Sequence, residues 1–426
     1  MTIDSLLQPF HHFGVNLGLE RIEKLLANLG NPHHKVPIVH VAGTNGKGSV
    51  CAYLSSVLTA AGYCVGRYIS PHLVSWNERI CINDKPIPLA ELEWVILQVK
   101  SAISLDSESP TQFEVITAAA WLYFAQQKVD IAVIEVGLGG RLDATNVCDR
   151  PLVTIITSIS REHWQVLGPT LADIAGEKAG ILKPNCPAVI GQLPSEAMQV
   201  VKKRIEELNC PSVFPEAAKE LGTAETQRTQ RKEEERWVEY GGIEFPLGLL
   251  GEFQLSNSAL AIASLQFLQK QGWNIPSEAI VSGMRNAQWP GRLQWVNWKG
   301  HRILIDGAHN PAAAIALGHY INSLNPQSVT WIIGMLSTKD HADVFQALLQ
   351  PNDQLHLVPV PEPSSANPDD LASLAQQLCP QLSLIQTHPD LSDALEVAVP
   401  SNQGLTVLCG SLYLLGYFFQ LSQKSL

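Results

Sequence analysis

The chain has 426 residues, of which 46% are hydrophobic, and a formal net charge of −11 at pH 7. A chain of this length exceeds what one hydrophobic core usually supports, so we expect two domains. The acidic balance argues against non-specific nucleic-acid binding, which needs a basic surface, but it permits a local nucleotide-binding loop.

The eight cysteines are scattered and none forms a C-x-x-C pair, so the sequence indicates neither a zinc knuckle nor a redox-active dithiol. Scattered cysteines in a long chain are typical of a reduced, cytoplasmic protein, and the N-terminus shows no signal-peptide pattern. The apolar stretch at residues 405–421 is short and contains Gly410 and Gly416, which favours a buried strand and helix over a membrane span. We expect a cytoplasmic monomer that binds neither membrane nor nucleic acid.

The first part of the chain alternates apolar strands with helical segments. Residues 17–29 have helical spacing, and Gly30 and Pro32 end that helix. We expect further strands at residues 38–41, 64–69, 131–135 and 152–156, and helices at 49–61 and 114–127. This alternation predicts a doubly wound parallel sheet, in which ligands bind beyond the carboxyl ends of the strands. Residues 216–236 are polar and charged and predict a solvated insertion or loop.

A second α/β series follows a boundary near residues 298–300. We expect its strands at residues 302–305, 329–333, 355–360 and 405–408, and helices at 311–321, 341–349, 368–378 and 391–399 and at the C-terminus. The sequence thus predicts an α/β protein: an N-terminal P-loop ATP-binding domain with a mostly parallel sheet at residues 1–297, and a smaller C-terminal Rossmann-like α/β domain at 298–426.

The segment GTNGKGS at residues 43–49 joins the strand at 38–41 to a helix. Such a loop presents backbone N–H groups to a polyphosphate at a helix N-terminus. It is shorter than the common G-x-x-x-x-G-K-[ST] motif, because Gly48 follows Lys47 and the hydroxyl of Ser49 comes one place late. Lys47 can still neutralise phosphate charge. An ordinary Gly/Asn turn is the alternative, but the order of strand, loop, lysine, hydroxyl and helix favours a nucleotide site.

Other polar residues follow strand ends. Glu135 ends an apolar strand, where a carboxylate beside a phosphate loop would hold Mg²⁺; a solvent-facing acid is the alternative. From residue type alone, His163 is more simply a structural histidine and Lys178 a helix-surface lysine. Asp306 and His309 follow a strand of the second domain and could face a cleft, although His309 or Asn310 could simply cap the next helix.

Together these motifs resemble the folylpolyglutamate synthase/dihydrofolate synthase family of the ATP-dependent Mur ligase superfamily. The resemblance covers nearly the whole chain. It rests on the segments LGLERI (17–22), GNPH (30–33), GTNGKGS (43–49), SPHL (70–73), NERI (77–80), TQFE (111–114), EVGLGGRLDATN (135–146), GEKAGI (176–181), WPGR (289–292), DGAHNP (306–311), KD (339–340) and GSLY (410–413).

The resemblance implies roles for particular residues. It implies two Mg²⁺ ions, with Ser70, Glu135, His163 and a carbamylated Lys178 as their ligands. ATP would contact Thr44, Asn45, Gly46, Lys47, Gly48, Ser49, Asn257, Arg292 and Asp306. The folate or pteroate would contact Thr111, Phe113, Glu114, Leu142, Asp143 and Ala144. L-Glutamate would contact His309 and Ser411. Lys47, Lys178 and His309 would act in catalysis.

Two positions depart from the family pattern. Glu162 stands where the family usually has Asp before the metal-binding histidine, and Phe253 replaces His in the segment GEFQLSNS at residues 251–258. Gln254 and Asn257 of that segment remain, so we expect the ATP contacts to persist.

The resemblance implies an ATP-dependent amide ligase that adds L-glutamate to dihydropteroate, to tetrahydrofolate or to both. A substrate carboxylate would attack the γ-phosphate, and glutamate would then attack the acyl phosphate, which must be kept from water. Two alternatives remain open at the level of sequence: a P-loop kinase of a small metabolite, and a nucleotide-gated binding protein without turnover. Only the ligase requires an amine for phosphate release.

Overall fold

The computed structural model describes residues 2–11, 16–104, 108–222, 235–400 and 404–424. The chain forms two compact units, one of residues 1–248 and 254–288 and the other of residues 249–253 and 289–426. Both are α/β, which confirms the predicted fold class. The assignment of residues 1–297 to ATP and folate and of 298–426 to glutamate stays a prediction.

An eight-stranded sheet forms the centre of the first unit, in the order β4-β3-β2-β5-β1-β6-β7-β8. Neighbouring strands from β2 through β5, β1, β6 and β7 to β8 pair in parallel, and β3 and β4 add an antiparallel edge next to β2. Buried positions run without interruption along β1 and β5, as expected for strands covered on both faces. The strands are β1 Ile38–Ala42, β2 Val65–Tyr68, β3 Ile80–Ile82, β4 Lys85–Pro86, β5 Ile131–Glu135, β6 Val153–Ile156, β7 Ala188–Ile190 and β8 Ser212–Val213.

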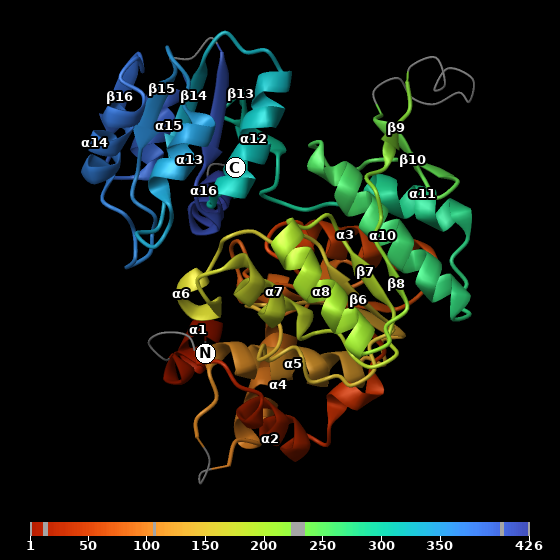
Figure 1. Ribbon diagram of the computed structural model, residues 1–426. Helices are drawn as coiled ribbons and strands as arrows, with labels where there is room; N and C mark the ends of the chain where they lie inside the picture. The colour runs from red at the N-terminus through yellow and green to blue at the C-terminus, as the bar shows by residue number, and fades with distance from the viewer. Residues whose placement is uncertain (1, 12–15, 105–107, 223–234, 401–403, 425–426) are drawn as a thin grey trace. The chain divides into compact units, whose positions relative to one another are not determined.

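Helices cover this sheet on its two sides (Figure 1). Helix α5 packs through Phe124 against Gly66 of β2, and α3 packs against β1, β2 and β5. Since β1 lies between β5 and β6, the loops after these three strands meet at one edge of the sheet. The helices are α1 Ile3–Leu7, α2 Glu20–Asn28, α3 Lys47–Ala60, α4 Leu89–Ser101, α5 Gln112–Gln126, α6 Trp164–Leu167, α7 Leu171–Ala179, α8 Ser195–Glu207, α10 Phe253–Lys270 and α11 Ser277–Asn286.

A small antiparallel sheet consists of β9 (Lys219–Glu220), β10 (Trp237–Tyr240) and β11 (Ile243–Pro246). Of these strands only β9 falls within residues 216–236, which we expected to be an insertion or loop. That expectation was wrong for residues 219–220, because β9 pairs with β10 despite its charged side chains. Residues 223–234 of the expected loop lie outside the described residues.

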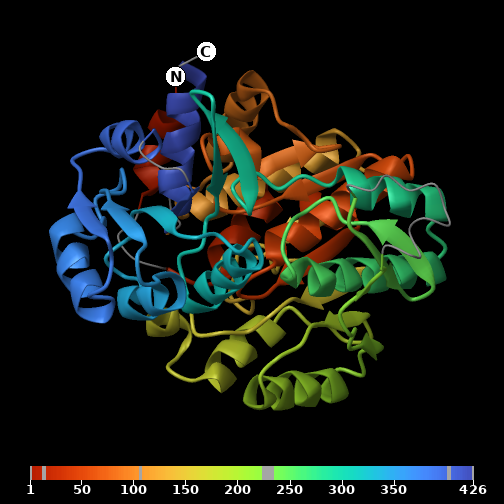
Figure 2. The ribbon, with the colours of Figure 1, turned by 90° about the horizontal axis from the view of Figure 1, so that it is seen from above.

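The second unit contains a six-stranded sheet in the order β12-β13-β17-β14-β15-β16. Its first two strands form an antiparallel hairpin (Figure 2), and the others are parallel. Lys299 and Gly300, which we took as a boundary signal, form the hairpin turn with positive φ angles of 48° and 87°. The elements are β12 Gln294–Trp298, β13 His301–Ile305, α12 Pro311–Ser323, β14 Val329–Ile333, α13 His341–Leu348, β15 Gln354–Leu357, α14 Pro368–Leu378, β16 Leu384–Thr387, α15 Leu391–Ala398, β17 Leu405–Cys409 and α16 Leu412–Lys424.

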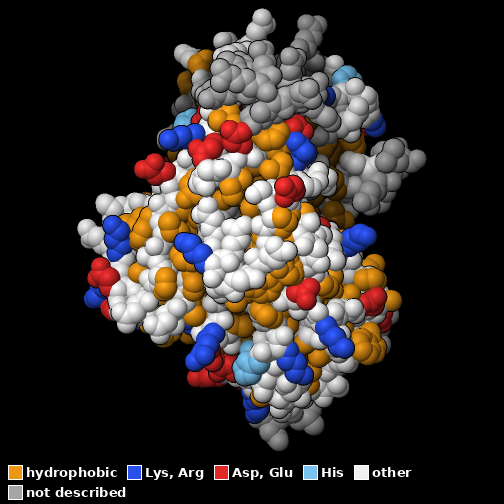
Figure 3. Space-filling view, turned by 90° about the vertical axis from the view of Figure 1, so that its right-hand side faces the viewer, with side chains coloured by type: hydrophobic (Ala, Val, Ile, Leu, Met, Phe, Trp, Pro, Cys, Tyr) orange, Lys and Arg blue, Asp and Glu red, His pale blue; other side chains and the backbone are white. Residues whose placement is uncertain are grey.

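The apolar stretch near the C-terminus forms β17 and α16, as predicted. In the part of the chain that the structure describes, no helix is long and apolar enough to cross a membrane. On the face drawn in Figure 3, Lys and Arg side chains lie among Asp and Glu side chains and do not form a continuous basic surface.

Two buried histidines of the second unit predict a loss of stability in acid. Nδ1 of His356 lies 2.9 Å from Nε2 of His388, and burial lowers the pKa of His356 from 6.5 to about 4. The unfolded chain therefore binds more protons than the folded chain between these pH values, so the free energy of unfolding falls as the pH drops through that range. We expect the Tm to be lower at pH 5 than at pH 7.5, and the double variant H356L/H388L to reduce that difference by about 5 °C.

The exposed His301 supplies the control for this measurement. The variant H301L is expected to keep the wild-type difference in Tm between the two pH values. An H356L/H388L variant whose Tm depends on pH as strongly as the wild-type Tm would contradict the prediction.

Candidate active site

The phosphate loop of residues 43–46 leaves β1 and ends where α3 begins at Lys47. It is tied to the segment after β6: the Thr44 amide donates to the Ser158 carbonyl at 2.8 Å, and the Asn45 amide donates to the Ser158 hydroxyl at 3.0 Å. Two close approaches require glycine. A Cβ at Gly43 would overlap Thr157, and a Cβ at Gly46, where φ is 87°, would lie 2.5 Å from Oδ1 of Asn257. The loop is therefore a fixed backbone turn at a helix N-terminus, which suits a polyphosphate.

Two lysines converge on the loop. The Lys47 ammonium donates to the carbonyls of Gly43 and Thr44, each at 3.1 Å, and lies 4.0 Å from Oε1 of Glu135. The Lys178 ammonium, on α7, donates to the Gly43 carbonyl at 2.8 Å. Lys178 is buried, and burial followed by the nearby Lys47 charge lowers its pKa to about 7. The interpretation of Lys178 as a helix-surface lysine was therefore wrong.

The residues predicted to bind Mg²⁺ come from separate elements of the first unit: Glu135 ends β5, Lys178 lies on α7, and Ser70 and His163 lie in loops. The Ser70 amide donates to Oε2 of Glu135 at 3.3 Å, so these two lie side by side below the phosphate loop. His163 precedes α6 in a left-handed conformation with φ of 51°. Within the described residues, no three His, Cys, Asp or Glu side chains gather as a metal site of their own. One carboxylate and a hydroxyl beside a phosphate cradle still fit Mg²⁺, which commonly takes its other ligands from water and substrate phosphates.

The start of α10 supplies polar groups beside the phosphate loop. Nε2 of Gln254 donates to the Ser49 hydroxyl at 3.2 Å, and Nδ2 of Asn257 donates to Oε1 of Gln254 at 3.1 Å. Sequence reasoning placed Asn257 here through the family resemblance and gave Gln254 no role of its own. Phe253, which departs from the family pattern, packs in the hydrophobic core of the second unit.

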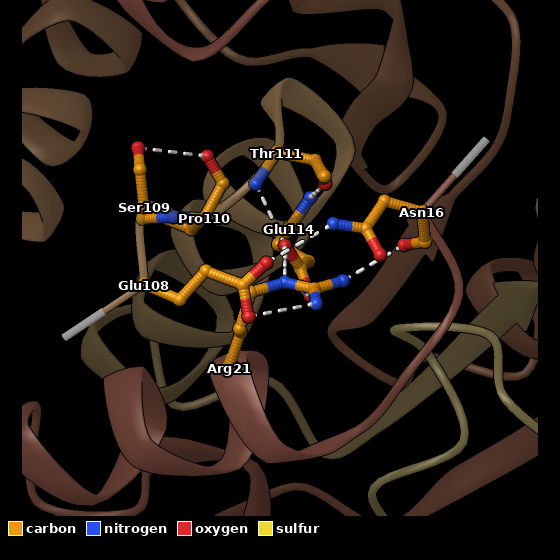
Figure 4. Close-up of polar contacts among 7 residues, drawn as sticks. All are labelled: Asn16, Arg21, Glu108, Ser109, Pro110, Thr111 and Glu114. Carbon is orange, nitrogen blue, oxygen red and sulfur yellow. Dashed lines mark hydrogen bonds and ion pairs between the residues drawn. The ribbon is translucent and has the colours of Figure 1, made fainter. Parts of the chain in front are cut away.

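The predicted folate residues Thr111 and Glu114 cap α5 reciprocally. The Glu114 amide donates to the Thr111 hydroxyl at 3.2 Å, and the Thr111 amide donates to the Glu114 carboxylate at 2.7 Å. Figure 4 shows the Arg21 guanidinium facing this carboxylate; Nε lies 3.1 Å from both oxygens. Arg21 also donates to the Asn16 carbonyl at 2.8 Å and lies 3.5 Å from Glu108. Arg21 therefore joins three segments around the start of α5, a role that the sequence analysis missed.

Replacing Arg21 with alanine is expected to lower the free energy of unfolding by about 2–4 kcal/mol, because it leaves a buried carboxylate without its cation. The side chains of Arg21 and Glu114 are only 11% and 4% exposed. Urea unfolding measures the change. As a matched control, R204A breaks the Arg204–Glu207 pair, whose side chains are 43% and 48% exposed, and is expected to cost less than about 1 kcal/mol. Equal losses in R21A and R204A would contradict the prediction.

The remaining predicted folate residues lie around the loop that follows β5. The ring of Phe113 packs so closely on Gly137 that any side chain there would overlap it. Asp143 is buried, and its carboxylate accepts the Leu138 amide at 2.7 Å. The Leu142 carbonyl accepts the Gly18 amide at 3.4 Å, and Ala144 is buried. The structure thus brings the predicted folate residues together around the loop of residues 137–144.

The residues predicted in the second unit gather at the carboxyl end of β13 and at the start of α16. The buried Asp306 carboxylate accepts the amides of Leu293 and Ala308, both at 2.8 Å. Burial raises the pKa of Asp306, and the charge of Arg292 opposes that rise. His309 Nδ1 lies 2.7 Å from the Gly307 carbonyl, and the buried Ser411 hydroxyl accepts the Tyr413 amide at 3.2 Å.

Helix α12 is capped by Asn310, whose side chain accepts the Ala313 amide at 2.9 Å. The sequence left two candidates for this cap, His309 and Asn310. The structure shows that Asn310 is the cap and that His309 lies one position before it.

The chain matches family models over both units. Residues 41–265 match the Mur ligase middle domain, and residues 292–421 match the dihydrofolate synthetase C-terminal domain. Dihydrofolate synthase/folylpolyglutamate synthase of Bacillus subtilis is 36% identical over 418 residues, which cover 94% of each chain. Dihydrofolate synthetase of Saccharomyces cerevisiae is 33% identical and covers 97% of this chain and 99% of its own.

Solved structures agree. Mycobacterium tuberculosis folylpolyglutamate synthase, complexed with ADP and AMPPCP, superposes with a TM-score of 0.84 at 30% identity, covering 98% of this chain and 97% of that chain. Escherichia coli FolC in complex with DHPP and ADP gives a TM-score of 0.83 at 29% identity, covering 99% and 97%. The chain therefore belongs to the folylpolyglutamate synthase/dihydrofolate synthase family of the Mur ligases and is an ATP-dependent ligase.

Proposed function

We propose that this ligase joins L-glutamate to dihydropteroate, to tetrahydrofolate or to both, through an acyl phosphate. The observation that carries the proposal is the convergence of Lys47, Lys178 and Glu135 on the loop at Gly43. This arrangement places two amines and a carboxylate where a triphosphate would bind. Relatives that match nearly the full chain also support the proposal, because they are named dihydrofolate synthase/folylpolyglutamate synthase and dihydrofolate synthetase.

We assign the substrates to the residues predicted for them. We assign residues 44–49, Asn257, Arg292 and Asp306 to ATP. The folate or pteroate contacts Thr111, Phe113 and Glu114 and the loop of residues 142–144. L-Glutamate contacts His309 and Ser411.

Ser70, Glu135, His163 and Lys178 would hold Mg²⁺, with Lys178 as its carbamate. Bound Mg²⁺ would neutralise charge on the phosphates during transfer. Carbamate formation requires a neutral amine, and a pKa of about 7 leaves a large share of Lys178 neutral near neutral pH. A carbamate would also place a negative charge beside Lys47 in place of a second positive one.

In the proposed reaction the chain acts mainly by positioning charge. Backbone amides of residues 46–48 and the Lys47 ammonium stabilise the charge that develops on the γ-phosphoryl group as the folate carboxylate attacks it. ADP leaves, and the glutamate amine attacks the acyl carbon, which releases phosphate and forms the amide. We further propose that the enzyme works as a cytoplasmic monomer; all eight cysteines are free thiols, which suits a reducing compartment.

A substrate panel tests this function. Dihydropteroate and tetrahydrofolate are each incubated with ATP and Mg²⁺, with and without L-glutamate, and product mass and phosphate release are measured. We expect phosphate release to require both the folate and glutamate, with products heavier by glutamate residues. Phosphate release that is independent of glutamate, or a phosphorylated product, would contradict the proposal.

A further inference from the structure

A buried chain of hydrogen bonds links the strand before the phosphate loop to the loop after β5. His40 lies on β1 and is 1% exposed, and its Nε2 lies 2.9 Å from the Thr145 hydroxyl. That hydroxyl lies 2.6 Å from Oδ1 of Asp143 and is fully buried. None of the predicted site roles includes His40 or Thr145.

The donor and the acceptor of each hydrogen bond in this chain follow from the chemistry of the groups involved. The Asp143 carboxylate accepts the Thr145 amide at 3.0 Å and the Leu138 amide at 2.7 Å. Burial raises the pKa of Asp143, and hydrogen bonds from its own loop oppose that rise. The Thr145 hydroxyl donates to Oδ1 of Asp143, so its lone pairs accept from His40 in turn. Burial lowers the pKa of His40 to about 3, so the imidazole is neutral and carries its proton on Nε2.

The Asp143 carboxylate is therefore occupied within its own loop. Its two oxygens offer about four lone-pair sites, and the amides of Leu138 and Thr145 and the Thr145 hydroxyl take three of them. The residue is 2% exposed. A carboxylate in this environment is held chiefly by donors of its own loop.

We propose that His40, Thr145 and the carboxylate of Asp143 form a positioning chain that fixes the backbone of residues 137–146 for folate binding. This inference rests on the proposed function. The Asp143 side chain acts through the loop. It holds in place the backbone of residues 142–144 and Gly137, on which the Phe113 ring packs. His40 and Thr145 hold that carboxylate in place and touch neither substrate.

Steady-state kinetics of four variants test the positioning role. T145V removes the hydroxyl at nearly constant volume, T145S restores it, and H40L removes the donor to it. T154V is the matched control, because Thr154 is equally buried but donates to the Pro187 carbonyl on the other side of β6. We expect T145V to raise the folate KM about tenfold, H40L to raise it severalfold, and both to leave the ATP KM within twofold. T145S and T154V should keep the wild-type folate KM within about twofold.

Amide exchange, measured by mass spectrometry without any ligand, gives a readout independent of activity. Peptides covering residues 136–147 should exchange faster in T145V and H40L than in wild type, T145S and T154V. Faster exchange together with an unchanged folate KM would overturn the positioning role, and unchanged exchange would overturn the chain itself. If T145V does not fold, H40L carries both measurements. A wild-type enzyme that turns over no folate would instead refute the proposed function, while exchange would still decide whether the chain holds the loop.

Discussion

Replacing Lys47 with alanine is expected to lower kcat by about a thousandfold while the folate KM changes little. The Lys47 ammonium is held by the carbonyls of Gly43 and Thr44 and lies 4.0 Å from Glu135. Negative charge moves across the phosphoryl group as it is transferred, so a fixed cation beside it stabilises the transition state more than the bound substrate. Initial rates of ADP formation at varied folate concentration give both constants.

The control for this variant is K203A, which removes an exposed lysine from α8. K203A is expected to retain the wild-type kcat. A K47A enzyme that keeps more than about a tenth of the wild-type kcat would show that the loop amides alone suffice for transfer, and the place of Lys47 in the mechanism would have to be given up.

Replacing Lys178 with alanine is expected to lower activity by about a hundredfold, with partial recovery on addition of acetate. The variant loses the group that we propose to carry a carbamate, and a small carboxylate can enter the space left by the side chain. Ligase rates are measured with K178A and with wild type over a series of acetate concentrations. Acetate is not expected to raise the wild-type rate.

A structural role for Lys178 predicts a different result. If the side chain only tethered the loop through its 2.8 Å hydrogen bond to the Gly43 carbonyl, acetate would not restore activity, since it offers no donor. K178A with wild-type activity and no additive would exclude both roles.

The phosphate loop could be predicted because its parts are adjacent in sequence. Strand, glycines, lysine and helix follow one another within residues 38–60, so local conformation alone assembles the cradle. The same holds for most parallel strands, whose apolar runs mark both buried faces. β16 was missed because its residues, Leu384–Thr387, are mostly exposed at the edge of the sheet and carry no apolar pattern.

Side-chain environments made by distant residues could not be predicted in this way. Lys178 is buried by a contact with Gly43, 135 residues away, and therefore looked like a surface lysine in the sequence. Arg21 and Glu114 are 93 residues apart, and His40 and Thr145 are 105 apart. Residue type and spacing carry no information about such pairs, so family resemblance supplied roles for some of these residues and the structure alone supplied their partners.

The pairing of β1 with β5 has a consequence for how such enzymes diversify. In the proposed function, the loop that leaves β1 carries the nucleotide chemistry and the loop that leaves β5, its neighbour, selects the acid. Because His40 of β1 is hydrogen-bonded to Thr145 of the second loop, a change in that loop is coupled to the strand that carries the phosphate loop. A Mur-type scaffold built on this strand pair can acquire a new acceptor acid through substitutions in the second loop that keep this link, with its energy-coupling step inherited intact.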